Sequence, residues 1–205
     1  MGLGSRSFLL PLLVVGVAAC TSGSSNFHGE IARVDSARIY VCHGFDCRNT
    51  TRLDVSAGDR AALSRIMETG RSGPTEERAA VSRAVQYFEE RSTEVIGVRD
   101  EARSHIRQTG EVGQMDCIDV STNTRSLLLY LAEVGLLRHH VVERNVTRGA
   151  IFDGRYFHAT AVLRENASGE RWAVDGWYGP GGAAPQIKPM SQWLGEGFLG
   201  GGGGV

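Results

Sequence analysis

Three side chains in the second half of the chain have the types and the order that a thiol-based catalytic triad requires. Cys117 comes first, His158 follows it, and Asp175 comes last. The thiolate is the reacting form of a cysteine, a neighbouring histidine can take its proton, and a carboxylate can fix the tautomer of that histidine. The sequence therefore indicates a nucleophile, its base and an orienting acid.

Cys117 stands just before a segment, residues 121–134, whose apolar side chains recur at helical spacing. Residues 121–123 are Ser, Thr and Asn, which suit a first turn or a cap. A thiol at this place lies close to unpaired backbone N–H groups and to the positive end of the helix dipole. This position and a neighbouring histidine would lower the pKa of the Cys117 thiol, whereas the nearby carboxylates of Asp116 and Asp119 would raise it.

His158 and Asp175 lie in two predicted strands. Residues 155–163 and 171–178 have strand composition, and residues 165–169 between them are typical of a turn. The two segments therefore predict a β-hairpin. One face collects Phe157, Ala159, Ala161, Leu163, Trp172 and Val174, and the other carries His158, Thr160, Ala173 and Asp175.

The length of the turn sets the register of this hairpin. If the loop consists of residues 165–168, Leu163 pairs with Glu170 and His158 lies directly opposite Asp175. Cβ atoms of directly opposite residues are about 4.5–5.5 Å apart, so the carboxylate can accept a hydrogen bond from the imidazole. A register slip of two residues would weaken this geometry without destroying it.

The order of these residues resembles a known family. A Cys that opens a helix, then a strand His, then a strand Asp followed by an aromatic residue, is similar to the core of the transglutaminase-like superfamily of papain-related folds. The resemblance covers residues 114–178 and is carried most clearly by residues 115–119, 121–124 and 172–177. Within the superfamily these segments look most similar to bacterial proteins near the transglutaminase-like cysteine proteinases.

The resemblance implies a fold, an activity and site residues. The fold would be α+β, with the nucleophile at a helix N-terminus packed on an antiparallel sheet. Cys117 would attack an amide or ester carbonyl and form a thioester, His158 would act as base and then acid, and Asp175 would orient His158. Most bacterial relatives of this kind are hydrolases, and acyl transfer to an amine stays open. Gln114 is a secondary candidate for the oxyanion hole, beside the backbone N–H of Cys117.

The N-terminus resembles a bacterial export signal. Residues 1–19 contain an apolar stretch, residues 8–17, that is too short to span a membrane. The small residues before Cys20 resemble a lipoprotein box, in which Cys20 is lipidated and followed by a tether to residue 30. An ordinary cleaved signal peptide stays open. With Thr21 after the Cys, we expect the protein to face the periplasm from the outer membrane, held by its lipid.

The remaining cysteines divide into a close pair and a single thiol. Cys42 and Cys47 are predicted to form a disulfide, because an exported protein meets an oxidising compartment. A metal site built from Cys42, His43 and Cys47 is the alternative, although a fourth ligand is not evident. Cys117 is then the odd thiol, either reactive or merely buried.

Length and charge bound the rest. The chain has 205 residues and a net charge of −1 at pH 7, which gives no reason to expect a nucleic-acid partner. Residues 31–195 are expected to form one domain, monomeric, with residues 196–205 as a glycine-rich tail. No cofactor is expected, although Asp116 and Asp119 could bind Ca²⁺ or a cationic substrate rather than cap a helix.

Upstream of Cys117 the sequence predicts an accessory layer. Residues 38–41 are a predicted strand, and residues 56–59 resemble a capping box before a helix that ends at Gly70. Pro74 is predicted to open a second helix. Two adjacent histidines, His139 and His140, lie on a predicted strand at residues 138–142 and are expected to be solvated or packed rather than metal ligands. Trp177 and Tyr178 either line a cleft or belong to the core.

Two functional classes remain open. The first is a lipid-anchored periplasmic cysteine hydrolase that acts on a peptide, a protein or the peptide part of peptidoglycan. The second is a noncatalytic binding or scaffolding lipoprotein in which Cys117 is structural. A low pKa of the Cys117 thiol would favour the enzyme.

Overall fold

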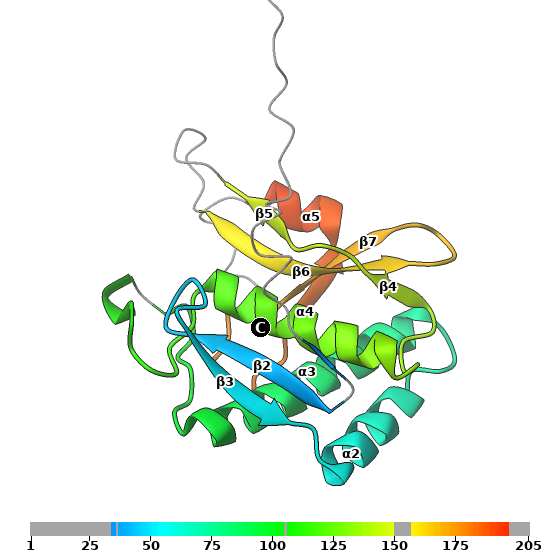
Figure 1. Ribbon diagram of the computed structural model, residues 1–205. Coiled ribbons are helices and arrows are strands. Elements are labelled where there is room, and N and C mark those ends of the chain that lie inside the picture. Colours follow the sequence, from blue (N-terminus) through cyan, green and yellow to red (C-terminus); the bar gives the residue numbers. More distant parts are fainter. Residues whose placement is uncertain (1–33, 36, 105, 150–156, 197–205) are drawn as a thin grey trace, which may run out of the picture.

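A central helix held between two antiparallel sheets defines the architecture (Figure 1). The computed structural model describes residues 34–196 except 36, 105 and 150–156. The expected signal segment, the lipidation site Cys20, the tether to residue 30 and the tail after residue 196 lie outside the described residues. Within the described part, no helix is long and apolar enough to cross a membrane.

The first sheet is formed by the N-terminal part of the described chain. It has the order β1-β2-β3, and its strands are β1 (Val34–Asp35), β2 (Arg38–His43) and β3 (Asn49–Asp54). All pairs are antiparallel, and β2 and β3 pair from Arg38↔Asp54 to His43↔Asn49. The predicted strand at residues 38–41 is thus confirmed as part of β2.

The second sheet carries two of the three predicted triad residues. Its order is β4-β6-β7-β8, with β5 paired to the first residues of β6. The strands are β4 (His140–Val142), β5 (Val146–Arg148), β6 (His158–Glu165), β7 (Arg171–Asp175) and β8 (Gln186–Pro189). Every pairing is antiparallel.

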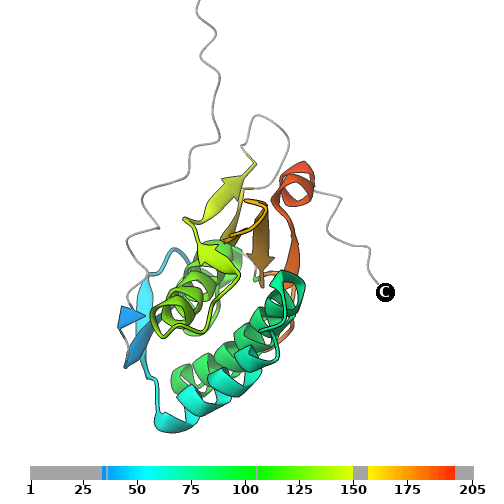
Figure 2. The same cartoon turned by 90° about the vertical axis from the view of Figure 1, so that its right-hand side faces the viewer.

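The helices complete the molecule. They are α2 (Ala57–Glu68), α3 (Pro74–Ile96), α4 (Cys117–Glu133), the short α5 (Met190–Gly195) and one 3₁₀ turn, η1 (Ile106–Gln108). In Figures 1 and 2, α4 runs between β2 on one side and β6 on the other, with α3 packed behind and α2 against α3. The arrangement is α+β, as expected.

One large apolar core joins these elements. Its side chains come from β2, β3, α2, α3, α4 and the α4-facing side of β6 and β7. A smaller cluster lies between α5 and the other face of β6 and β7, and consists of Val162, Ala173, Met190 and Trp193. His158 and Asp175 share this second face with Val162 and Ala173, because side chains alternate along a strand.

Local signals explain the N-terminal helices. Ser56 caps α2 and forms a reciprocal capping box with Asp59, as predicted. Pro74 occupies the first turn of α3, where a missing backbone N–H costs nothing. Gly97 ends α3 with a φ of 84°, a left-handed conformation that glycine adopts without steric cost.

The hairpin exists, but the expected register is wrong by two residues. Leu163 pairs with Trp172, not with Glu170, and Ala161 pairs with Val174. The turn accounts for the difference, because the Glu165 N–H bonds to the Glu170 carbonyl and the loop begins after Glu165. A slip of two preserves the face of every side chain, so His158 and Asp175 are diagonal neighbours instead of direct ones.

Two adjacent histidines take packed positions in the described structure. His140 is buried, with Nδ1 2.7 Å from Glu77 Oε2 and Nε2 3.1 Å from the Arg78 guanidinium. His139 is half-buried, and its Nε2 lies 3.1 Å from the Arg71 carbonyl oxygen. Each ring therefore has a protein partner that accounts for it.

Candidate active site

Cys117 is the first residue of α4, four residues earlier than the predicted helix start. Asp116 is the N-cap, and its Oδ1 accepts hydrogen bonds from the backbone N–H groups of Ile118 (3.1 Å) and Asp119 (2.9 Å). The Ser and Thr residues expected at the start lie inside the helix, and the Ser121 hydroxyl donates to the Ile118 carbonyl. Cys117 is buried and is a free cysteine.

His158 and Asp175 form a buried pair. The Nε2 of His158 lies 2.6 Å from Oδ2 of Asp175, and both side chains are almost fully buried. The same Oδ2 accepts a hydrogen bond of 2.8 Å from the indole Nε1–H of Trp193 in α5. Two donors on one carboxylate oxygen fix the plane of that carboxylate and, through it, the ring of His158.

The pairing also sets the tautomer of His158. A carboxylate accepts, so the Nε2 of His158 carries the proton, and the neutral ring keeps the lone pair on Nδ1. Nδ1 is buried and has no hydrogen-bond partner among the described residues. A buried acceptor without a hydrogen-bond partner costs free energy and therefore calls for an explanation. Acceptance of a proton from a thiol would be one such explanation.

The Cys117 sulfur reaches the start of the same strand. The backbone N–H of Ala159, the residue after His158, lies near it and lowers its pKa. Cys117 thus lies near the start of β6, and the charge of Asp175 acts on its thiol. The His158 ring lies on the face of β6 that carries Trp193. Ala159 escaped sequence reasoning because a backbone donor leaves no mark in residue type.

Of the opposing effects expected on the Cys117 thiol, those that raise its pKa prevail in this structure. Burial raises the pKa of Cys117 to about 12, and the negative charge of Asp116 adds to the increase. The Ala159 N–H opposes this effect but does not overcome it. Desolvation outweighs the helix N-terminus because the sulfur is enclosed, so the resting group is a thiol and not a thiolate.

Aromatic rings surround His158. Their centroids lie 4.9 Å away for Trp177, 5.4 Å for Tyr178 and 5.6 Å for Trp193. Trp193 is fully buried and packs in the small core, whereas Trp177 and Tyr178 are half-buried. The contact of Trp193 with Asp175 joins residues 18 positions apart and could not be seen in the sequence.

Arg148 supports this aromatic group. It pairs with His158 across β5 and β6, its guanidinium lies 4.2 Å from the Trp193 ring centroid, and it donates to the Tyr178 hydroxyl at 2.9 Å. It also bonds to the Trp193 carbonyl and to Glu196. Arg148 therefore fixes the segment that carries Trp193.

Gln114 has other contacts than an oxyanion would require. Its Oε1 accepts from the Glu101 backbone N–H (3.2 Å) and the Ser104 hydroxyl (3.1 Å), and its Nε2 donates to the Arg99 carbonyl (3.3 Å). These bonds join Gln114 to the loop that follows α3. The backbone N–H of Cys117 stays the other predicted donor for an oxyanion.

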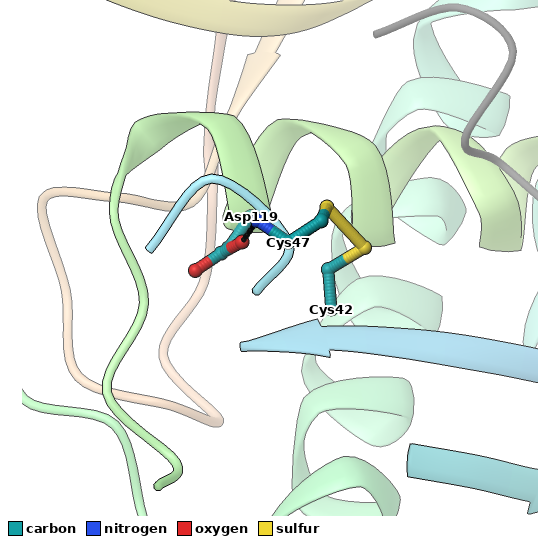
Figure 3. Close-up of side chains that lie close together, drawn as sticks. All are labelled: Cys42, Cys47 and Asp119. Atoms are coloured by element: carbon teal, nitrogen blue, oxygen red, sulfur yellow. Dashed lines mark hydrogen bonds between the residues drawn. A yellow bond between two sulfur atoms is a disulfide. The ribbon is translucent and has the colours of Figure 1, made fainter. Parts of the chain in front are cut away.

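The predicted disulfide between Cys42 and Cys47 is present. Ligand atoms of Cys42, Cys47 and Asp119 lie within 4.8 Å of one another (Figure 3), but the two sulfurs are bonded to each other. The alternative metal ligand His43 places Nε2 3.0 Å from the Thr51 hydroxyl and accepts the Gly113 N–H at Nδ1. A disulfide and not a metal site accounts for these side chains.

Asp116 and Asp119 act as acceptors for backbone groups. Asp119 accepts the N–H of Phe45 (2.8 Å) and of Cys47 (2.6 Å), and Asp116 Oδ2 accepts the N–H of Asp46 (3.1 Å). Asp116 thus has the capping role that was one of its two interpretations. Both carboxylates join the start of α4 to the disulfide loop.

Two further carboxyl groups, those of Glu89 and Asp100, lie beside α4. Glu89 and Asp100 line a cavity large enough for about one water molecule, together with Val120, Asn123 and Gly176. Burial raises the pKa of Glu89 to about 8 and of Asp100 to about 7. Glu89 accepts the Gly182 N–H at 2.8 Å and so anchors the loop after Asp175.

The chain was also compared with known proteins. No family model, no curated protein and no solved structure matches it.

Proposed function

We propose that the protein is a transglutaminase-like cysteine hydrolase that cleaves peptide or isopeptide amides. The observation that carries the proposal is the Nδ1 of His158, which is buried and has no hydrogen-bond partner among the described residues. The Nε2 of the same ring is held by Asp175. The next residue, Ala159, has its backbone N–H near Cys117, the only free thiol of the described chain. These are the base, the orienting acid and the nucleophile of a thiol triad.

The chemistry follows from these positions. The Cys117 sulfur attacks the amide carbon while His158 Nδ1 takes the thiol proton, and the carbonyl oxygen becomes an oxyanion that the Cys117 N–H can stabilise. His158 then gives its proton to the leaving amine, and a thioester remains. Water attacks the thioester after losing a proton to Nδ1, and the carboxylic acid and the thiol are released.

The raised pKa of Cys117 shapes this proposal. The thiol ionises as it attacks, because burial disfavours a resting thiolate. His158 is therefore a general base toward a neutral thiol rather than one half of a preformed ion pair. Entry of an amine in place of water would make the same machinery an acyltransferase.

The second candidate is a noncatalytic binding or scaffolding lipoprotein. The burial of Cys117 and the pKa of about 12 favour it, since an inert structural cysteine has the same two properties. The two candidates differ in whether the reactivity of Cys117 depends on His158.

The decisive experiment is the rate of Cys117 alkylation by iodoacetamide between pH 6 and 10, followed by peptide mass spectrometry. We expect His158→Ala and His158→Gln to label about 100-fold more slowly than the wild type at pH 7.5, the lower range for a positioned base. His139→Ala, which alters a half-buried histidine with a backbone contact only, is the matched control and should label as the wild type. Equal rates in all variants would reject the triad and favour the scaffold.

We propose a location together with the activity. Lipidation at Cys20 would hold the domain at the periplasmic face of the outer membrane, where proteins and peptidoglycan peptides are within reach. Metabolic labelling with a fatty acid, compared between the full chain and Cys20→Ala, tests the anchor. Equal incorporation in both would reject it.

A further inference from the structure

The loop closed by the Cys42–Cys47 disulfide has an unusual backbone. Gly44, Phe45, Asp46 and Cys47 have φ values of 85°, 71°, 55° and 49°. Glycine adopts this left-handed region freely, but residues with a side chain rarely do, and consecutive ones need an external restraint. The conformation therefore persists only because its surroundings impose it.

Three backbone hydrogen bonds and the disulfide supply that restraint. The N–H groups of Phe45 and Cys47 bond to Asp119 at 2.8 and 2.6 Å, and the N–H of Asp46 bonds to Asp116 at 3.1 Å. A left-handed turn points successive N–H groups to one side, which is how it binds carboxylate oxygens. Figure 3 shows the Asp119 carboxylate against Cys47 and the disulfide.

The same carboxylates control the start of α4. Asp116 caps the helix through Oδ1 and holds the loop through Oδ2, and Cys117 lies between Asp116 and Asp119. The loop also bonds directly to the segment before the nucleophile, through the Gly44 N–H and the Gln114 carbonyl at 2.7 Å. The disulfide loop and the Cys117 backbone are thus one hydrogen-bonded unit.

We propose that the Cys42–Cys47 disulfide is a redox switch that keeps Cys117 reactive while it is oxidised. A dithiol reductant would attack the half-buried Cys47 sulfur and then release Cys42, so that two thiols form and the reductant becomes a disulfide. The loop then leaves the left-handed region and withdraws three N–H groups from Asp116 and Asp119. Asp116 and Asp119 then lose these donors, the cap of α4 is released, and the backbone that positions the Cys117 sulfur and its N–H shifts.

This inference rests on the proposed function only in taking Cys117 as the nucleophile. The test measures Cys117 alkylation at pH 7.5 by peptide mass spectrometry in oxidised protein, in protein reduced with a phosphine that is then removed, and after reoxidation with oxidised glutathione. We expect reduction to slow the labelling by about tenfold, which corresponds to about 1.4 kcal/mol, and reoxidation to restore it.

The variant Cys42→Ser/Cys47→Ser is the matched control. It should label as slowly as the reduced wild type, and the phosphine should change its rate no further. Circular dichroism recorded alongside shows whether the reduced wild type stays folded, and the reduced wild type carries the test if the double variant does not fold. Labelling of folded protein that does not change with reduction would overturn the switch. If the rate depends on His158 but not on reduction, only the switch fails, whereas independence of His158 removes the proposed function.

Discussion

One oxygen atom of Asp175 joins two parts of the molecule. Oδ2 accepts from His158 at 2.6 Å and from Trp193 at 2.8 Å, and Oδ1 accepts the Trp177 N–H at 3.3 Å. A buried carboxylate is tolerated only when such donors replace its water, so each donor contributes to stability as well as to orientation. Trp193 is therefore a positioning residue for His158.

We expect Trp193→Phe to lower the free energy of unfolding by about 1.5–3 kcal/mol, the usual cost of losing a hydrogen bond to a charged group. The matched control is Trp172→Phe, because the Trp172 Nε1 is buried and has no hydrogen-bond partner among the described residues. Urea denaturation of both variants measures the difference. A Trp172→Phe variant as unstable as Trp193→Phe would mean that ring packing, and not the bond to Asp175, decides.

Sequence reasoning identified the residues of the site better than their electrostatics. The pairing of His158 with Asp175 could be predicted because the hairpin pattern is visible in the sequence, and the role of Cys117 stays a prediction. The pKa of Cys117 could not be predicted, because the degree of burial depends on how α4, β6 and the loop before α4 meet. Trp193 and the backbone N–H of Ala159 were missed for the same reason.

At the scale of elements, strong local signals gave correct predictions and weak ones did not. The capping box of α2 and Pro74 of α3 were both predictable. The strand β3 escaped because its sequence is largely polar, with Leu53 its only buried residue. The register of the hairpin was predicted wrongly because the loop begins one residue later than expected, after Glu165. A shift of the loop by one residue moves the strand pairing by two.

Asp59 of the α2 capping box belongs to a hydrogen-bonded network whose contribution to stability should depend on pH. Burial raises the pKa of Asp59, but hydrogen bonds from Tyr87 and Ser56 overcome this effect and lower it to about 2. We expect Asp59→Ala to cost at least about 2 kcal/mol near pH 6. The contribution is present above the ordinary pKa of 3.8 and is lost as the pH falls through about 2, so the cost should shrink there.

Urea denaturation at pH 6 and at pH 2.5 measures this change. Asp54→Ala removes a carboxylate whose ion pair with Arg52 is exposed, and it should change stability little at either pH. A cost for Asp59→Ala that is the same at both pH values would contradict the assignment.

The whole molecule combines groups whose titration works in opposite directions. Asp59 stabilises the fold in its charged form, whereas Glu89 and Asp100 have raised pKa values and favour the protonated form when folded. A group with a raised folded pKa contributes stability that is complete below its unfolded pKa and is lost as pH rises through the folded value. For Glu89 this interval runs from 4.5 to about 8.

We therefore expect the midpoint temperature of thermal unfolding to decrease as the pH rises from 5 to 8.5. Glu89→Gln keeps an acceptor for the Gly182 N–H and cannot ionise, so its unfolding midpoint should fall less than that of the wild type over this interval. Glu90→Gln, at the exposed neighbouring position, should follow the wild type. Identical pH profiles for Glu89→Gln and the wild type would show that Glu89 is not the group responsible.

The bonds between the disulfide loop and α4 have a consequence for the order of folding. Asn123 bonds to both backbone groups of Cys42, and Asp119 bonds to Cys47, across 81 and 72 residues of chain. The Cys42–Cys47 ring, by contrast, closes over a separation of 5 residues. Short loops close at low entropic cost and distant contacts form late. The ring can therefore close early in folding, whereas the arrangement around Cys117 is complete only when both halves of the chain have met.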